Sequence, residues 1–140
     1  ASYRRQRQMC IRDRFRGGGR VFGPRPRSYD QKVNKKVKKL ARKSALAYKL
    51  KNKEVLILED FKFSSPKTSD YIKIIKAFGL ESKKTLLVTS ETNKNIYLSS
   101  RNIKNSKVII NSELNTYEIT DANNILILES AVEGIETTLK

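Results

Sequence analysis

The chain has 140 residues, a formal net charge of +16, one cysteine, and neither histidine nor tryptophan. Its length suits one domain with one hydrophobic core. The lack of histidine excludes Ser-His-Asp and Cys-His catalytic arrangements, and a single cysteine excludes an internal disulfide or a cysteine-rich metal centre. No apolar run approaches the ~20 residues that a membrane-spanning helix needs, so no membrane partner is expected.

The positive charge is concentrated in the first part of the chain. Residues 1–53 hold 19 Lys and Arg against two Asp, whereas residues 54–140 hold 11 basic against 12 acidic residues. A packed core does not require such a one-signed segment, which repels itself and is stable mainly against a polyanion. The charge pattern therefore predicts a nucleic-acid partner.

Residues 1–31 are predicted to form an extended basic arm. Their arginines follow no apolar period, and three consecutive glycines together with Pro24 and Pro26 forbid a continuous helix. Arginine forks bind phosphates, and glycines let the chain lie close to a nucleic-acid backbone. The aromatic residues between the arginines either stack on unpaired bases or pack the arm against the body; these residues are Phe15, Phe22 and Tyr29.

Residues 32–51 are predicted to form a helix with nine basic and no acidic residues. On a helical wheel, one stripe is expected to dock on the body; it contains Val33, Val37, Leu40, Ser44, Ala47 and Tyr48. The cations of the opposite face are expected to meet phosphates; they are Lys35, Lys38, Lys39, Arg42 and Lys49. Leu46 and Leu50 fit neither face well.

The rest of the chain alternates between apolar strands and short helices. Strands are predicted at residues 55–58, 85–88, 108–110 and 125–128. One helix starts at Thr68 or Ser69 as its cap and ends at Gly79, another covers residues 93–101, and Ser130 with Glu133 opens a final helix as a capping box. This order predicts an α/β domain at residues 32–140, with a four-stranded, mainly parallel sheet and flanking helices.

Two enzyme-like features need an interpretation. The triple glycine continues into neither a Gly-Lys-Ser/Thr phosphate loop nor a Gly-x-Gly-x-x-Gly fingerprint. The acidic residues behind the strands could form a metal or acid–base site, but charging the first turns of the following helices is the preferred interpretation; they are Glu59, Asp60, Glu91 and Glu129. A nucleotide-dependent enzyme on a doubly wound sheet therefore remains an alternative, as does a basic RNA-binding regulator that acts alone.

Several motifs occur in a recognisable order. Arg-Gly-Gly-Gly stands at residues 16–19, Phe-Gly-Pro at 22–24, Pro-Arg at 26–27 and Asn-Lys-Lys at 34–36. Asn115-Thr116-Tyr117 precedes the last strand. Together these residues resemble the family of bacterial large-subunit ribosomal protein four, and the resemblance extends over residues 16–140.

The resemblance implies a structural protein rather than an enzyme, without cofactor, metal or small-molecule substrate. The family binds large-subunit ribosomal RNA beside neighbouring large-subunit ribosomal proteins in the cytoplasmic ribosome, assists subunit assembly, and helps to form the peptide exit tunnel with a basic loop. The predicted RNA-binding residues are Arg16, Gly17, Gly18, Gly19, Arg20, Phe22, Arg25, Arg27, Tyr29, Lys32, Lys35, Lys36, Lys38, Lys39, Arg42 and Lys43.

The sequence departs from the family at its start. The family places a strand and a helix before the loop, whereas this chain starts inside the loop, so a fragment is expected. Residues 1–14 lack the Gly-Thr-Gly-x-Ala-Arg pattern of the loop tip, and the stretch Arg5 to Arg14 resembles a translation of sequencing-adapter DNA. No tunnel function is therefore assigned to residues 1–14.

Overall fold

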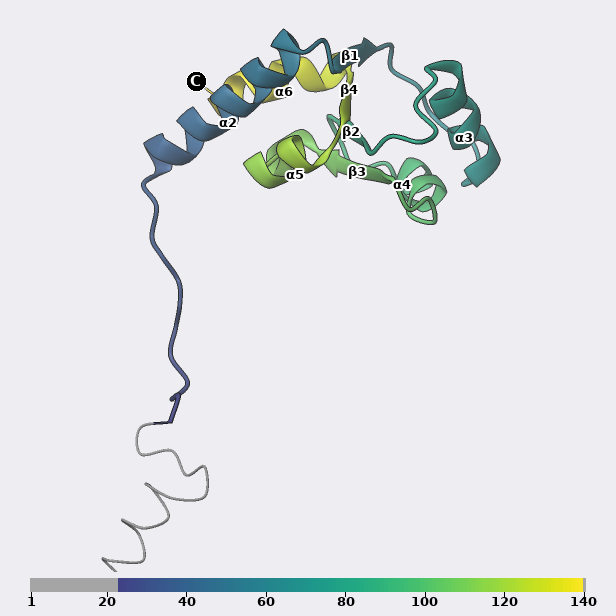
Figure 1. Ribbon diagram of the computed structural model, residues 1–140. Helices are drawn as coiled ribbons and strands as arrows, with labels where there is room; N and C mark the ends of the chain where they lie inside the picture. Colours follow the sequence, from purple (N-terminus) through teal and green to yellow (C-terminus); the bar gives the residue numbers. More distant parts are fainter. Residues whose placement is uncertain (1–22, 140) are drawn as a thin grey trace, which may run out of the picture. The chain divides into compact units, whose positions relative to one another are not determined.

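The computed structural model describes residues 23–139 of the chain (Figure 1). These residues belong to two compact units: the first ends at Lys32 and the second begins at Val33. Residues 23–32 contain no helix or strand, and each of them is exposed. All the helices and strands of the described residues therefore lie in the second unit.

A four-stranded parallel sheet forms the centre of the second unit. Its strands are β1 (Val55–Leu58), β2 (Thr85–Thr89), β3 (Ser106–Ile110) and β4 (Asn124–Leu128), in the spatial order β1-β4-β2-β3. Leu126 in β4 lies opposite Leu56 on one side and Leu87 on the other. The predicted α/β class with a parallel sheet and flanking helices is confirmed, and the central strands β2 and β4 are buried along most of their length, as apolar runs predict.

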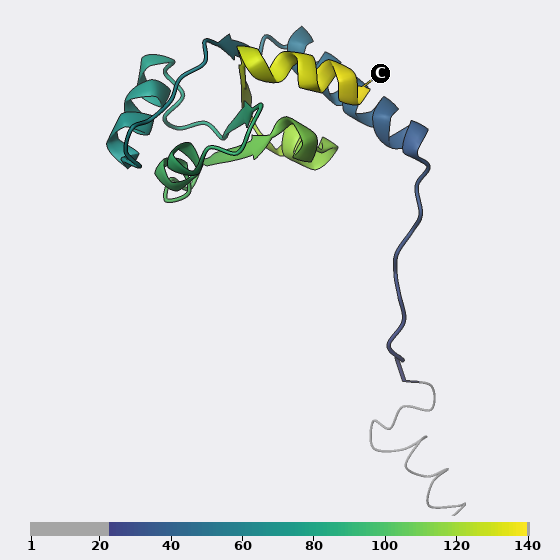
Figure 2. The ribbon, with the colours of Figure 1, turned by 180° about the vertical axis from the view of Figure 1, so that it is seen from behind.

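The helices that flank the sheet lie before β1, in the connections between the strands and after β4. They are α2 (Lys35–Lys51), α3 (Thr68–Ala77), α4 (Lys94–Ser100), η1 (Asn111–Glu113), α5 (Thr116–Asp121) and α6 (Glu129–Leu139). Helix α3 packs beside α4, and α2 packs beside α5 and α6, as the front and back views show (Figures 1 and 2). Within residues 23–139, no helix has both the length and the apolar character needed to cross a bilayer.

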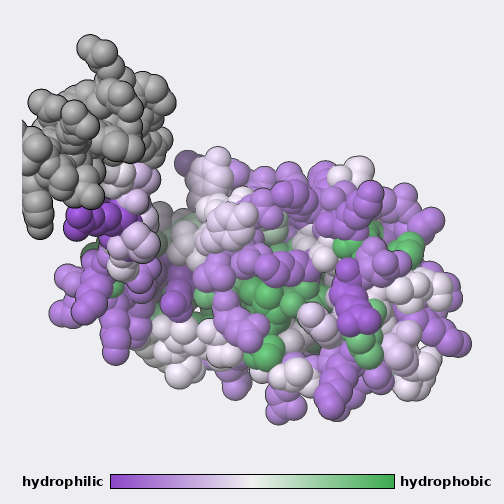
Figure 3. Space-filling model, turned by 90° about the horizontal axis from the view of Figure 1, so that it is seen from below, coloured by the Kyte–Doolittle hydropathy of each residue, from purple (hydrophilic) through white to green (hydrophobic). Residues whose placement is uncertain are grey.

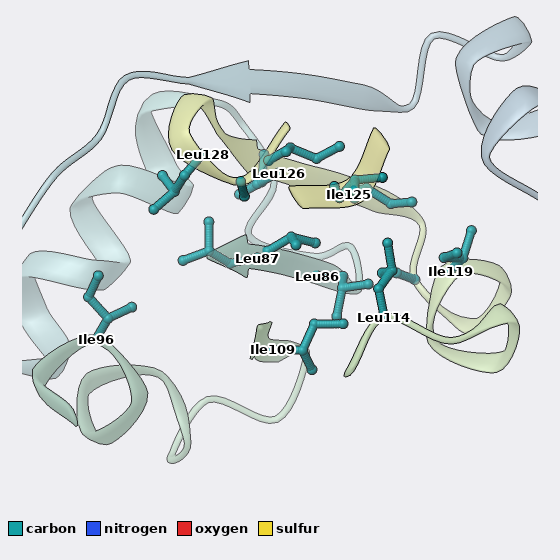
Figure 4. Packing of buried hydrophobic residues seen from close by; sticks show 14 of the residues in the cluster. Leu86, Leu87, Ile96, Ile109, Leu114, Ile119, Ile125, Leu126 and Leu128 are labelled. Carbon is teal, nitrogen blue, oxygen red and sulfur yellow. The ribbon is translucent and has the colours of Figure 1, made fainter. Parts of the chain in front are cut away.

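The core lies between the central strands and the helices. Figure 4 shows Leu86 and Leu87 of β2 and Leu126 of β4 among side chains contributed by α4, α5 and the segment around η1. Tyr71 of α3 is also buried, and its hydroxyl lies 2.8 Å from the Ser106 hydroxyl at the start of β3. This hydrogen bond satisfies the one polar atom that Tyr71 brings into the core.

The face of α2 that packs on the body differs from the predicted one. Val37, Leu40 and Tyr48 of the predicted docking stripe are 52%, 67% and 64% exposed, whereas Leu46 is 9% exposed. The packed face also includes the half-buried Ala41 and Ala45, whose small side chains allow close approach. The prediction that the stripe from Val33 to Tyr48 docks is therefore wrong, because the wheel locates an apolar face but not the surface available to it.

An apolar groove follows from this packing. It has a volume of about 350 Å³ and is lined mainly by side chains of α2, β1 and α6, among them Leu50, Ile57 and Leu139. Ile57 is 66% exposed because β1 is an edge strand. On the face shown in Figure 3, most of the surface is hydrophilic, and hydrophobic side chains gather near its centre.

The helix ends differ from the sequence-based predictions at two places and agree at a third. Helix α3 begins at Thr68 with Lys67 at its N-cap, so neither Thr68 nor Ser69 caps it. Helix α5 was missed, although the Asn115 side chain accepts a hydrogen bond from the Glu118 N–H as a helix cap does. Gly79 does end α3, with a φ of +64° that suits glycine.

Candidate nucleic-acid interface

The described part of the arm presents its cations to solvent. Arg25 and Arg27 of the arm are exposed, as is Lys32, which lies before α2 and not in the helix predicted for residues 32–51. None of the three forms an ion pair with a residue of the range 23–139. The Arg27 guanidinium lies 4.8 Å from the ring centre of Tyr29, which makes a cation–π contact. Planar groups arranged in this way can bind a phosphate and stack on a base.

The neighbouring acidic residue, Asp30, forms local hydrogen bonds with Ser28. The Ser28 hydroxyl donates a hydrogen bond to Asp30 Oδ2 over 3.0 Å, and the Asp30 N–H donates to the Ser28 hydroxyl over 3.3 Å. Asp30 is the only acidic residue between residues 23 and 53. Its carboxylate therefore leaves the arginines of the arm available for other anions.

The first half of α2 gathers its cations on one broad side. Lys35, Lys38 and Lys39 are neighbours three and four residues apart, and Lys36 lies beside Lys39, three residues before it. All residues from Lys35 to Leu40 are exposed, so this part of the helix is not covered by the body. Arg42 is half-buried, and Lys43 is exposed. A one-signed helix surface of this kind attracts polyanions.

Lys49 is not part of this cationic surface. It was predicted to lie on the outer face of the helix, but it is only 8% exposed, and its Nζ pairs with Glu54 Oε2 over 2.7 Å. The salt bridge joins the end of α2 to the residue before β1. The prediction for Lys49 is wrong, because the charged face of the helical wheel includes the side that packs on the body.

The predicted RNA-binding residues fall into two groups. Arg16, Gly17, Gly18, Gly19, Arg20 and Phe22 lie outside the described residues. The others are placed on the arm or on α2, where most are exposed; they are Arg25, Arg27, Tyr29, Lys32, Lys35, Lys36, Lys38, Lys39, Arg42 and Lys43. We use the term "cationic surface" for Lys35, Lys36, Lys38, Lys39 and Lys43 of α2.

One of the acidic residues behind the strands, Asp60, stabilises a helix start. Asp60 Oδ1 accepts hydrogen bonds from the Ser130 N–H over 3.3 Å and from the Ser130 hydroxyl over 2.9 Å, in the first turn of α6. The Ser130 hydroxyl also lies 2.9 Å from that of Ser90. The predicted capping box of Ser130 and Glu133 is therefore replaced by a cap from a distant residue.

Glu59, Glu91 and Glu129 are exposed, and no group of three or more possible metal ligands occurs within residues 23–139. A cleft of about 380 Å³ lies beside Asp60, at the carboxyl ends of the strands. Its central polar groups, Asp60, Ser90 and Ser130, already bond to one another. The geometry thus supports the helix-capping interpretation for Asp60, and Glu129 lies in the first turn of the same helix.

Sequence reasoning missed a second basic and aromatic surface on α4. Lys94 and Tyr97 lie three residues apart on one side of α4, and Arg101, the C-cap residue, follows Tyr97 by four residues. All three are exposed, and neither cation forms an ion pair with a described residue. The sequence signal for this surface was Tyr97, which stands three residues after Lys94 and four residues before Arg101.

The comparisons with known proteins agree on one family. Residues 5–138 match the model of the ribosomal protein L4/L1 family. The large ribosomal subunit protein uL4 of Christiangramia forsetii is 56% identical over 125 residues, which are 89% of this chain and 60% of the relative. The protein of the same name from Flavobacterium psychrophilum is 55% identical over 125 residues, with the same coverage of both chains.

A more distant relative, the large ribosomal subunit protein uL4 of Bacteroides thetaiotaomicron, is 47% identical over 123 residues, 88% of this chain and 59% of its own length. The chain thus spans about 60% of the length of the curated relatives it matches. These relatives are named as ribosomal subunit proteins and not as enzymes. The chain belongs to the ribosomal protein L4/L1 family.

Proposed function

We propose that this chain acts as a structural constituent of the large ribosomal subunit and binds ribosomal RNA through its arm and the cationic surface of α2. The observation that carries the proposal is the run of Lys and Arg residues in positions 25–43, all exposed except the half-buried Arg42, none of which forms an ion pair within residues 23–139. Unpaired cations of one sign destabilise a chain alone and are neutralised by phosphates.

The chain divides its charge in a way that suits this role. The five salt bridges of the described residues all lie between Lys49 and Asp121. Residues 54–140 hold 11 basic against 12 acidic residues, so their charges nearly balance. The body therefore needs no polyanion for its own stability, whereas the arm and the first half of α2 do. We propose residues 1–31 as a basic arm and residues 32–140 as the globular domain that positions it.

The finer parts of the proposal rest on the family. By its membership, the protein would assemble early with large-subunit ribosomal RNA and with neighbouring subunit proteins in the cytoplasmic ribosome. Its basic loop, with Arg16 to Tyr29 at the base and returning limb, would help to form the wall of the peptide exit tunnel. No catalytic step, cofactor or small-molecule substrate belongs to this proposal.

Binding across a salt series tests the proposal. The 140-residue chain is titrated with large-subunit ribosomal RNA and, separately, with an equal mass of unrelated structured RNA. A preference for the ribosomal RNA that persists near physiological salt supports a specific ribosomal role. Equal binding to both RNAs that vanishes as the salt rises contradicts it, because counterion release alone produces non-specific binding of that kind.

A further inference from the structure

A second surface of the chain carries features of nucleotide recognition that are independent of the arm. A cleft of about 390 Å³ lies between α4 and the ends of β2 and β3. It is lined by Thr89, Thr92, Asn93, Tyr97, Val108, Ile109, Ile110 and Glu113. We propose that this cleft binds one unpaired RNA nucleotide whose base carries an exocyclic amino group. The proposal rests on the RNA-binding function proposed above.

The walls of the cleft suit the faces of a base. The Tyr97 side chain lines the cleft and is 54% exposed, although apolar residues line the same cleft. Val108 and Ile110 of the edge strand β3 are half-buried and supply apolar area in the same cleft. An aromatic ring beside aliphatic side chains is the arrangement on which unpaired bases stack.

The helix that carries Tyr97 also offers cations for the phosphates of a nucleotide. Lys94 lies three residues before Tyr97 at the start of α4, and Arg101 lies four residues after it at the C-cap. Both are exposed, and neither pairs with an acidic residue among those described. They can bind the phosphates on either side of a base that is stacked on Tyr97. In this they differ from four lysines that each form a salt bridge with an acidic residue; these are Lys73, Lys76, Lys84 and Lys107.

Glu113 determines which base fits. Its side chain lines the cleft, and its carboxylate makes no hydrogen bond to another residue of the range 23–139. A carboxylate accepts hydrogen bonds and cannot donate them, so it favours the amino group of cytosine, adenine or guanine. Uracil carries a carbonyl oxygen at C4, where cytosine carries its amino group, and a carboxylate repels that oxygen.

Ultraviolet crosslinking and affinity measurements on the 140-residue chain test the inference. The complex with large-subunit ribosomal RNA is irradiated and digested, and crosslinked residues are located by mass spectrometry. We expect a crosslink at Tyr97, retained in Tyr97→Phe and lost in Tyr97→Ala, with an affinity loss of about fivefold or more in the alanine variant. Tyr117→Ala is the matched control, because Tyr117 is 72% exposed on α5 and should not affect binding.

Short single-stranded competitors test the choice of base. We expect oligocytidine to compete better than oligouridine for the wild-type chain, and Glu113→Gln to abolish this difference, because the amide presents both a donor and an acceptor. If ribosomal RNA binds but Tyr97→Ala behaves like Tyr117→Ala and no crosslink forms at Tyr97, the inference is wrong while the proposed function stands. Loss of any preference for ribosomal RNA, with the Tyr97 crosslink intact, would instead contradict the proposed function.

Discussion

Asp60 accepts two hydrogen bonds from Ser130, a residue 70 positions later in the chain. The first bond comes from the backbone N–H in the opening turn of α6, and the second comes from the side-chain hydroxyl. A carboxylate at this place satisfies an unpaired helix donor and complements the positive end of the helix dipole. The contact ties the end of β1 to the start of α6, across the carboxyl edge of the sheet.

Replacing Asp60 with alanine should lower the free energy of unfolding by about 1–2 kcal/mol, because α6 loses its cap. Urea denaturation followed by circular dichroism measures the change. Glu59→Ala is the matched control, since Glu59 is exposed and makes no recorded hydrogen bond among the described side chains. Equal stability of the two variants would show that the Asp60 contact contributes nothing to the fold.

The packed face of α2 can be distinguished from the exposed one by two leucines six residues apart. Leu46→Ala should destabilise the protein by about 2–4 kcal/mol, because Leu46 is 9% exposed and joins the core. Leu40→Ala should change the free energy of unfolding by less than about 0.5 kcal/mol, because Leu40 is 67% exposed. If Leu40→Ala lowered the free energy of unfolding more than Leu46→Ala did, in thermal or urea unfolding, the docking face predicted from the helical wheel would be supported instead.

Alkaline pH should destabilise the fold partly through Tyr71. Burial raises the pKa of the Tyr71 hydroxyl above its ordinary value of 10.0, although the hydrogen bond with Ser106 opposes this shift. The unfolded chain therefore loses the tyrosine proton at lower pH than the folded chain does. The stability that comes from neutral Tyr71 is fully present below about pH 10 and is lost as the pH rises further.

The pKa of Lys84 is raised by its hydrogen bond to Asp121, and that of Lys107 by its hydrogen bond to Glu118, so both contribute losses of the same sign. Tyr71→Phe isolates the tyrosine, because phenylalanine keeps the ring and does not titrate. Between about pH 9 and pH 11, urea unfolding of the wild type should lose more stability than that of Tyr71→Phe. Parallel curves for the two proteins would argue against a contribution from Tyr71.

Neutralising the cationic surface should weaken RNA binding without loss of the fold. In the triple variant Lys35→Gln, Lys38→Gln, Lys39→Gln, the slope of log affinity against log salt should become less steep by roughly 0.7–0.9 for each lost phosphate contact. The control variant carries glutamine at three exposed, unpaired lysines of the body, Lys62, Lys67 and Lys83. Filter binding at several salt concentrations measures both, and identical slopes would place the RNA contact elsewhere.

The sheet could be predicted from the sequence because its signal is local. Val55 to Leu58 and Ile125 to Leu128 are unbroken apolar runs, and runs of this length bounded by polar residues form buried strands. The fold class followed from their alternation with helices. Even the missed helix α5 had a local signal, the Asn115 cap three residues before Glu118.

The contacts that depend on tertiary packing could not be predicted in this way. The helical wheel placed Lys49 on an outer face, whereas its ammonium group forms a salt bridge with Glu54 and its stem is buried. Asp60 could be assigned to a helix start in general, but its partner Ser130 is far away in the sequence. The cleft beside Tyr97 also depends on β3 lying next to α4, which periodicity alone does not specify.

The central claim is that ribosomal RNA binds the cations of the arm and the cationic surface of α2, and leaves Lys62, Lys67 and Lys83 free. Lysine footprinting tests it most directly: the chain is acetylated alone and in complex with large-subunit ribosomal RNA, and each lysine is quantified by mass spectrometry. The account predicts strong protection of Lys32 and of the cationic surface, with Lys62, Lys67 and Lys83 modified equally in both states. Protection of Lys62, Lys67 and Lys83 from acetylation, with the lysines of the cationic surface unprotected, would contradict it.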